Sequence, residues 1–137
     1  MSDIIKTIWI DAEPDHVWSC LVDKDKLGIW FQPPEKDLTA GEDYICHTKP
    51  TVENGTPVFG KVLEMDQPNR LVMTFNHAYL NHDTTVTFTL KAKDDGTELT
   101  LEHGGFAGAP GDPAKHIADH DGGWEPHLKD LKELAEK

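Results

Sequence analysis

The stretch HDGGWEPHLKDLKEL, residues 120–134, decides how this chain is expected to fold. From Trp124 to the residue just beyond this stretch, apolar side chains recur every three or four residues, the period of a helix with one buried face: Trp124, Leu128, Leu131 and Ala135. Gly122, Gly123 and Pro126 interrupt this pattern, although Gly and Pro are the two least favourable residues inside a helix. The sequence therefore predicts a terminal helix with a weak point beside Trp124.

The position where this helix begins decides what Pro126 does. A helix that begins near Ala114 carries Pro126 in its interior and is expected to kink between Asp121 and Pro126. A helix that begins at Gly123 carries Pro126 in its first turn, where the missing N–H costs little. In either case the paired glycines remove side chains, which allows the helix backbone to approach a sheet or bend over it.

The middle of the chain predicts a run of antiparallel strands. Six segments are rich in β-branched and aromatic residues, and several alternate between an apolar and a polar face: residues 4–10, 42–48, 58–65, 70–77, 84–92 and 97–103. Such alternation is typical of a sheet with one buried and one exposed face. KPTVENGTP, residues 49–57, predicts a loop with a turn at its Asn-Gly pair.

Two short helices are expected after the first strand, over residues 13–22 and 23–31, and two prolines end the second. A sheet with a single apolar face needs one cover, and the terminal helix is the only long element available. The sequence thus predicts one α+β domain over residues 1–137. It contains two short helices, about six antiparallel strands and a long C-terminal helix.

The composition excludes several classes of partner. The chain has 137 residues, with 25 Asp and Glu against 13 Lys and Arg, and its net charge is −12. Because a basic stripe is absent, we expect no nucleic-acid binding and no attachment to an anionic membrane surface. No stretch approaches the ~20 apolar residues of a membrane span. Cys20 and Cys46 have no metal-finger spacing, so the prediction is two reduced thiols in a cytoplasmic protein.

Four fragments, in this order, resemble one known family: DAEPDHVWSCLVDKDKLGIWF (11–31), GKVLEMDQPNRLVMTF (60–75), TELTLEHGGF (97–106) and GGWEPHLKDLKEL (122–134). This is the family of homologues of the activator of heat-shock protein 90 ATPase, within the START-like (SRPBCC) superfamily of helix-grip folds. The resemblance extends from about residue 4 to residue 135. One departure is Glu13, where the family usually has Pro, and Pro14 follows one position later.

The resemblance implies a helix-grip fold, in which a curved antiparallel sheet wraps around the C-terminal helix and leaves an apolar cavity between them. Relatives in the superfamily bind lipids, sterols or polyketides, and a few catalyse cyclisation or hydrolysis. Fold therefore says little about reaction. The weak point in the terminal helix is interpreted as the hinge of a lid at the mouth of the cavity.

The predicted ligand site combines inward-facing aromatic, apolar and imidazole side chains: Trp30, Phe31, Met73, Phe75, His77, Phe88, His103, Phe106, Trp124 and Leu128. The aromatic residues are expected to converge between sheet and helix, where ordinary core packing also explains each of them. His77 and His103 lie on predicted inward faces, so they are the first candidates for a polar anchor.

The leading hypothesis is a domain that binds a hydrophobic or aromatic small molecule in this cavity. One alternative is a protein-interaction module that resembles a co-chaperone, with a chaperone partner and a role in stress response. Another is a small cyclase or hydrolase that uses pocket histidines as general acid and base. No cofactor and no catalytic residue are predicted. Trp9 is expected on the outer face of the first strand, where it suggests a contact surface for a homodimer.

Histidines on the terminal helix suggest a metal site, which is the less favoured interpretation. At about 100° per residue, one narrow stripe of that helix contains three of them: His116, His120 and His127. His116 and His120 have the four-residue spacing of helical metal ligands, and a further ligand is available from Asp83, Asp121 or His103. A hydrogen-bonded flank beside the buried stripe is the preferred interpretation, and no metal is predicted.

Overall fold

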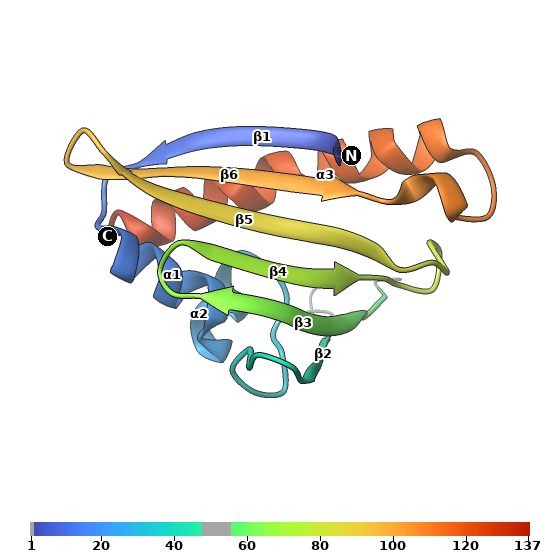
Figure 1. Cartoon of the computed structure of the whole chain (residues 1–137), viewed down its shortest axis with the longest axis horizontal. Helices are drawn as coiled ribbons and strands as arrows, with labels where there is room; N and C mark the ends of the chain where they lie inside the picture. Colours follow the sequence, from blue (N-terminus) through green and yellow to red (C-terminus); the bar gives the residue numbers. More distant parts are fainter. Residues whose placement is uncertain (1, 48–55) are drawn as a thin grey trace.

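The computed structural model describes residues 2–47 and 56–137, and within them six strands form one sheet that is accompanied by three α-helices (Figure 1). The elements follow the expected order: β1 Ser2–Ile10, α1 Pro14–Val22, α2 Lys24–Trp30, β2 Asp43–Cys46, β3 Val58–Asp66, β4 Arg70–Phe75, β5 Thr84–Lys93, β6 Gly96–Gly104, a 3₁₀ turn η1 Phe106–Gly108, and α3 Pro113–Ala135. The predicted loop over residues 49–57 lies almost entirely outside the described residues.

The sheet is antiparallel throughout, with strand order β1-β6-β5-β4-β3-β2. Its register aligns the predicted apolar positions in rows, of which one joins Leu71, Phe88 and Leu101 across three neighbouring strands. All three side chains are buried, which confirms the predicted inner face. A second row places His103 beside Val86 and Ile4 on the same face, so the register carries an imidazole into the core.

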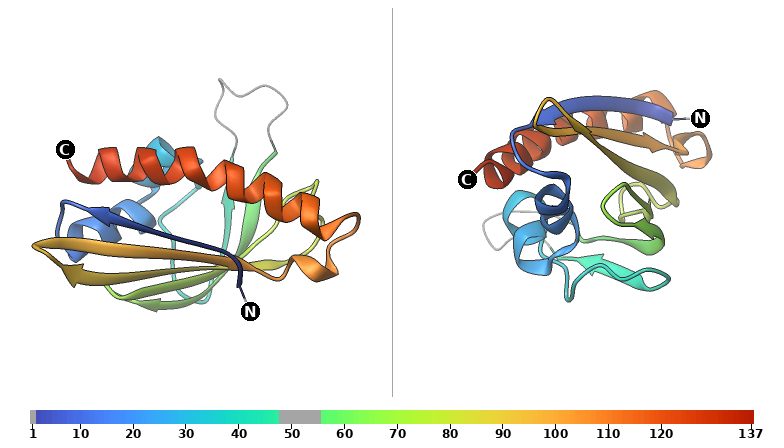
Figure 2. Two further views of the ribbon diagram at one scale, coloured as in Figure 1. Left: turned by 90° about the horizontal axis from the view of Figure 1, so that it is seen from above. Right: turned by 60° about the vertical axis from the view of Figure 1, so that its left-hand side comes forward.

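Figure 2 shows the sheet curving around one side, where α3 and the two short helices α1 and α2 lie together. The indole N–H of Trp30 donates a 2.7 Å hydrogen bond to the Cys20 carbonyl and so holds α2 against α1. The Asp23 carboxylate caps α2 by accepting from two backbone N–H groups. No helix within the described residues has the length and apolarity needed to cross a membrane.

The helix α3 begins well upstream of the paired glycines, so Pro126 lies in its interior. The helix continues through Pro126 without interruption, and Figure 2 shows its axis bending gently along its length. The ring of Pro126 removes the donor that would meet the carbonyl four residues earlier, at Gly122, which is the ordinary cause of a bend in a helix. The predicted buried stripe is confirmed: Trp124, Leu128, Leu131 and Ala135.

Close approach of the backbone does not explain the paired glycines. A Cβ added at Gly122 or at Gly123 would meet no atom within 4 Å. That part of the sequence interpretation is therefore wrong. The two glycines differ in another respect, because Gly123 lines a cavity and Gly122 does not.

Candidate functional site

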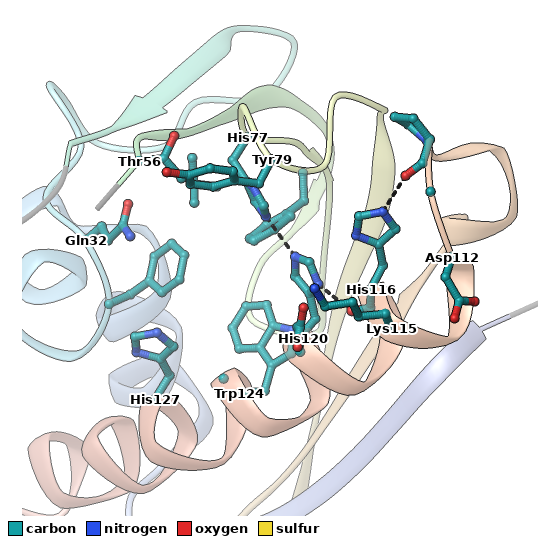
Figure 3. A pocket seen from close by; sticks show the side chains of 17 residues that line it. Gln32, Thr56, His77, Tyr79, Asp112, Lys115, His116, His120, Trp124 and His127 are labelled. Atoms are coloured by element: carbon teal, nitrogen blue, oxygen red, sulfur yellow. Dashed lines mark hydrogen bonds between the residues drawn. The ribbon is translucent and has the colours of Figure 1, made fainter. Parts of the chain in front are cut away.

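A cavity of about 660 Å³ opens between the first half of α3, the end of β4 and the segment that follows α2 (Figure 3). This volume lies within the range of about 300–1,000 Å³ that small-molecule sites occupy. Its lining mixes aromatic walls with polar groups: Phe31, Gln32, Thr56, Val58, Phe75, His77, Tyr79, Pro110, Gly111, Asp112, Lys115, His116, Asp119, His120, Gly123, Trp124 and His127.

Three aromatic rings from separate parts of the chain form the inner wall. Phe31 stacks on Trp124 with ring centroids 5.8 Å apart and planes 10° from parallel. Phe75, the last residue of β4, lies 5.9 Å from Trp124 at a tilt of 48°. Each ring is almost fully buried, so the wall is held by its own packing and presents a fixed apolar surface.

Two imidazoles meet at the edge of this wall. The Nε2 atoms of His77 and His120 are 2.9 Å apart, whereas the ring centroids are 5.1 Å apart and the planes differ by 21°. The rings therefore meet edge to edge through a hydrogen bond instead of lying face to face. His77 lies two residues beyond the end of β4 and His120 lies on α3, so the bond joins the end of the strand to the helix.

Hydrogen-bond partners define the tautomers of this pair. The carbonyl of His116 can only accept, so His120 Nδ1, at 2.7 Å, carries the hydrogen that is donated to it. In a neutral ring His120 Nε2 then carries no hydrogen, so its lone pair accepts from His77 Nε2–H. His77 Nδ1 is consequently left as an acceptor. It is buried and has no hydrogen-bond partner among the described residues.

Burial keeps the pair neutral near pH 7. Burial, followed by the charges of His120 and His116, lowers the pKa of His77 to about 4. Burial is also the largest cause of the lowered pKa of His120. A neutral pair with one defined acceptor is suited to hydrogen bonding with an uncharged ligand group.

His103 lies beneath the aromatic wall and is fully engaged by the protein. Thr84 Oγ1 donates to the Phe75 carbonyl at 2.6 Å, so the same oxygen accepts from His103 Nε2–H at 2.8 Å. His103 Nδ1 then accepts from the indole N–H of Trp124 at 3.0 Å. Burial lowers the pKa of His103 to about 3, and the neutral ring positions Trp124 in the wall.

The structure divides the ten residues of the predicted site into two groups. Four of them line the cavity: Phe31, Phe75, His77 and Trp124. The other six lie in the packed core: Trp30, Met73, Phe88, His103, Phe106 and Leu128. Beside Trp30, Met73 and Phe88, the packing leaves a void of only about 10 Å³. Direct contact with a ligand remains a prediction for the first group, and the residues of the second group do not line this cavity.

Several cavity residues were not among the predicted site residues. The histidine stripe on the terminal helix was the signal for three of them, since His116, His120 and His127 all line the cavity. Gln32 and Tyr79 carry no local signal, because each lies in a connecting segment whose path depends on the whole fold. Lys115 also lines the cavity, and its backbone N–H donates to the Asp112 carbonyl at 3.1 Å.

The geometry of the helix histidines differs from that of a metal site. His116 Nε2 bonds to the Pro110 carbonyl at 2.7 Å, while His120 Nε2 faces His77. Within residues 2–47 and 56–137, no group of three or more His, Cys, Asp or Glu side chains is arranged to hold a metal ion. Both thiols are free and buried, and burial raises the pKa of Cys46 to about 12, so this thiol stays protonated.

Solved structures of other proteins share this fold. CalU16 from Micromonospora echinospora is 27% identical, with a TM-score of 0.76 over 96% of this chain and 74% of that one. DynU16, a protein in the dynemicin biosynthetic locus, is 20% identical, with a TM-score of 0.82 over 98% of this chain. This chain covers 47% of DynU16, about half its length. The Aha1 dimer from Colwellia psychrerythraea is 20% identical, with a TM-score of 0.76 over 97% of this chain and 95% of that one.

The curved antiparallel sheet, the two short helices and the long terminal helix are thus the helix-grip arrangement expected from the sequence. No curated protein matches the chain in sequence. A family model described as Activator of Hsp90 ATPase homolog 1-like protein matches residues 11–136. The chain therefore belongs to the Activator of Hsp90 ATPase homolog 1-like family.

Proposed function

We propose that this protein binds a small, largely apolar or aromatic molecule in the cavity between α3 and the end of β4. The observation that carries the proposal is the cavity itself, because an aromatic wall and a neutral imidazole pair face one space of about 660 Å³. Phe31, Phe75 and Trp124 supply apolar contact, and His77 with its neighbours orients the polar part of the ligand.

The expected affinity is modest without polar contacts. A ligand that buries ~300 Å² of apolar surface gains roughly 7.5 kcal/mol at 25 cal/mol per Å². Association costs about 4 kcal/mol or more. The remainder corresponds to weak binding, so hydrogen bonds from the cavity are expected to decide which ligand is retained.

Native mass spectrometry of freshly purified protein tests this proposal. A co-purified molecule of defined mass is expected, and denaturation should release it. Quenching of tryptophan fluorescence by a panel of naphthalene derivatives provides the second measurement, since Trp124 lines the cavity. If no molecule co-purifies and no compound of the panel binds, the proposed function is contradicted.

Self-association is the second candidate. Ile5 and Trp9 are 62% and 40% exposed on β1, which is an edge strand of the sheet within the described residues, and the structural neighbour from Colwellia psychrerythraea was solved as a dimer. Sedimentation velocity of the wild type and of Ile5→Lys tests it. A dimer that the substitution disrupts supports self-association, and a monomer at all concentrations contradicts it.

Three further hypotheses have weaker support. A chaperone partner and a role in stress response rest on the family name, and catalysis rests on the imidazole pair as a general acid and base. The free buried thiols favour a cytoplasmic location. Pull-down with a purified chaperone distinguishes an interaction module from a small-molecule binder.

A further inference from the structure

The cavity has two hydrogen-bonding groups that the protein leaves unused. Among the described residues, two buried side-chain polar atoms have no hydrogen-bond partner, namely Gln32 Oε1 and His77 Nδ1. Both residues line the same cavity, although one follows α2 and the other follows β4. Buried polar atoms are satisfied in the great majority of cases, so two exceptions in one site call for a common explanation.

Both atoms are acceptors. The amide oxygen of Gln32 accepts by its nature. His77 Nδ1 accepts because its ring donates through Nε2 to His120, whose own Nδ1–H is used by the His116 carbonyl. The chain of bonds from His77 through His120 therefore ends at the backbone carbonyl of His116. It leaves a lone pair at the His77 end and supplies no donor there.

We propose that the natural occupant of the cavity is an aromatic molecule with at least two hydroxyl donors, one for His77 Nδ1 and one for Gln32 Oε1. This inference rests on the proposed function and specifies its ligand class. A hydroxyl that donates to His77 also strengthens the two bonds behind it, since hydrogen bonds in a chain polarise one another. Carboxylates and fully alkylated ethers lack donors, so they leave both acceptors unpaired.

A ligand reaches the two acceptors only after the Gln32 and His77 side chains rotate, because neighbouring protein atoms shield both of them from water. The final torsions of Gln and His side chains are broad, which makes small rotations possible. The donors on the cavity wall are not bonded to either atom: Tyr79 and Lys115 both line the cavity without such a contact. Under this proposal the ligand supplies the hydrogens that no donor of the described residues supplies.

A matched pair of probes tests the ligand class. Dihydroxynaphthalene and the dimethoxynaphthalene with the same substitution pattern share the aromatic core and the oxygen positions, but only the diol donates. Isothermal titration calorimetry on the full chain is expected to give the diol an affinity about tenfold or more above that of the diether. Equal affinities in the wild type would overturn the inference and leave the proposed function standing.

Gln32→Met provides the variant, because methionine keeps the length and removes the acceptor. The preference for the diol over the diether is expected to fall about threefold to tenfold in this variant. Gln67→Met is the matched control, since Gln67 is exposed and does not line the cavity. An unchanged preference in Gln32→Met, with the variant folded by circular dichroism, contradicts the role of Gln32.

Nitrogen NMR of the imidazole rings gives an independent measurement for His77. Addition of the diol is expected to shift the His77 Nδ1 resonance toward that of a hydrogen-bonded acceptor, and the diether is expected to leave it unchanged. A diol that binds without moving this resonance overturns the assignment of His77. If neither probe binds at all, this inference fails, whereas the proposed function is decided by the co-purified molecule and the wider panel.

Discussion

His77 and His120 are 43 residues apart in the sequence, and their Nε2 atoms lie 2.9 Å apart. The bond connects the end of β4 to the second turn of α3, and it leaves His77 Nδ1 as an unpaired acceptor beside the cavity. A contact between sheet and helix thus determines the chemistry that the cavity presents to a ligand.

The paired glycines lead to the first prediction, which separates cavity volume from helix stability. Gly123→Leu is expected to fill part of the cavity and abolish binding of the naphthalene probes, whereas Gly122→Leu leaves binding unchanged because Gly122 does not line the cavity. A Cβ meets no atom at either position, so both variants are expected to fold. Equal loss of binding in the two variants, measured by calorimetry, would contradict the assigned cavity.

The same glycines affect stability equally. Gly122→Ala and Gly123→Ala are each expected to raise the free energy of unfolding by about 0.5–1 kcal/mol, because alanine is the better helix former and nothing obstructs its methyl group. Urea denaturation followed by circular dichroism measures the change. A destabilising alanine at either position would indicate that the bend of α3 depends on the glycine itself.

The buried histidines predict a loss of stability in mild acid. The pKa values of His77 and His103 are lowered to about 4 and about 3, from 6.5, so the unfolded chain takes up their protons first as the pH falls. The free energy of unfolding is therefore highest above pH 6.5 and declines from there toward pH 4. The slope is at most about 1.4 kcal/mol per pH unit for each group.

Urea denaturation at several pH values between 7 and 4.5 checks this dependence. His77→Phe removes one titrating ring, so its stability is expected to decline less steeply than that of the wild type. Identical slopes would show that His77 is protonated in the folded protein over the same range as in the unfolded chain.

The bond between Trp124 and His103 leads to a third stability prediction. Trp124→Phe leaves His103 Nδ1 without its donor in the core, at a cost of about 1–3 kcal/mol in addition to the lost volume. Trp9→Phe is the control, because Trp9 is 40% exposed and water replaces its bond to the Lys93 carbonyl. Equal losses for the two variants in urea denaturation would show that the buried bond contributes little.

The ion pairs of Lys6 are expected to contribute little. Its ammonium group joins β1 to α3 by contacting Asp121 at 3.0 Å and also Glu125, and the two carboxylates are 52% and 71% exposed. Lys6→Met is therefore expected to lower the free energy of unfolding by no more than about 1 kcal/mol. The difference from the wild type should shrink at 1 M salt, and a difference that salt leaves unchanged would point to packing of the side-chain stem instead.

Local patterns in the sequence account for most of the fold. The alternation over residues 84–92 and 97–103 predicted the buried faces of β5 and β6, because burial follows the two-residue period of a strand. The helical stripe from Trp124 to Ala135 predicted the face of α3 that packs inward. The interpretation of Gly122 and Gly123 was wrong where it assumed that the sheet approaches the helix backbone there, because a sequence pattern does not specify which atoms surround a residue.

The candidate site followed from the sequence in part. Aromatic and imidazole side chains on inward faces were identified, but the sequence did not distinguish Phe75, at the cavity, from Phe88, in the packed core. Both occupy the same face of neighbouring strands, but Phe88 packs against Trp30 whereas Phe75 lies beside His77 and His120. Gln32 became a site residue only because the segment after α2 turns toward α3.

By itself, the sequence determined the order and type of the elements and the side of each that is buried, because these follow from residue period and turn chemistry. Only the tertiary structure decided that His77 bonds to His120 and that both ring nitrogens of His103 are hydrogen-bonded to Trp124 and Thr84. It also decided that a cavity with two unpaired acceptors remains. The physical reason is that hydrogen-bond partners and cavity volume depend on distances between elements that are remote in the chain. Local periodicity does not specify those distances.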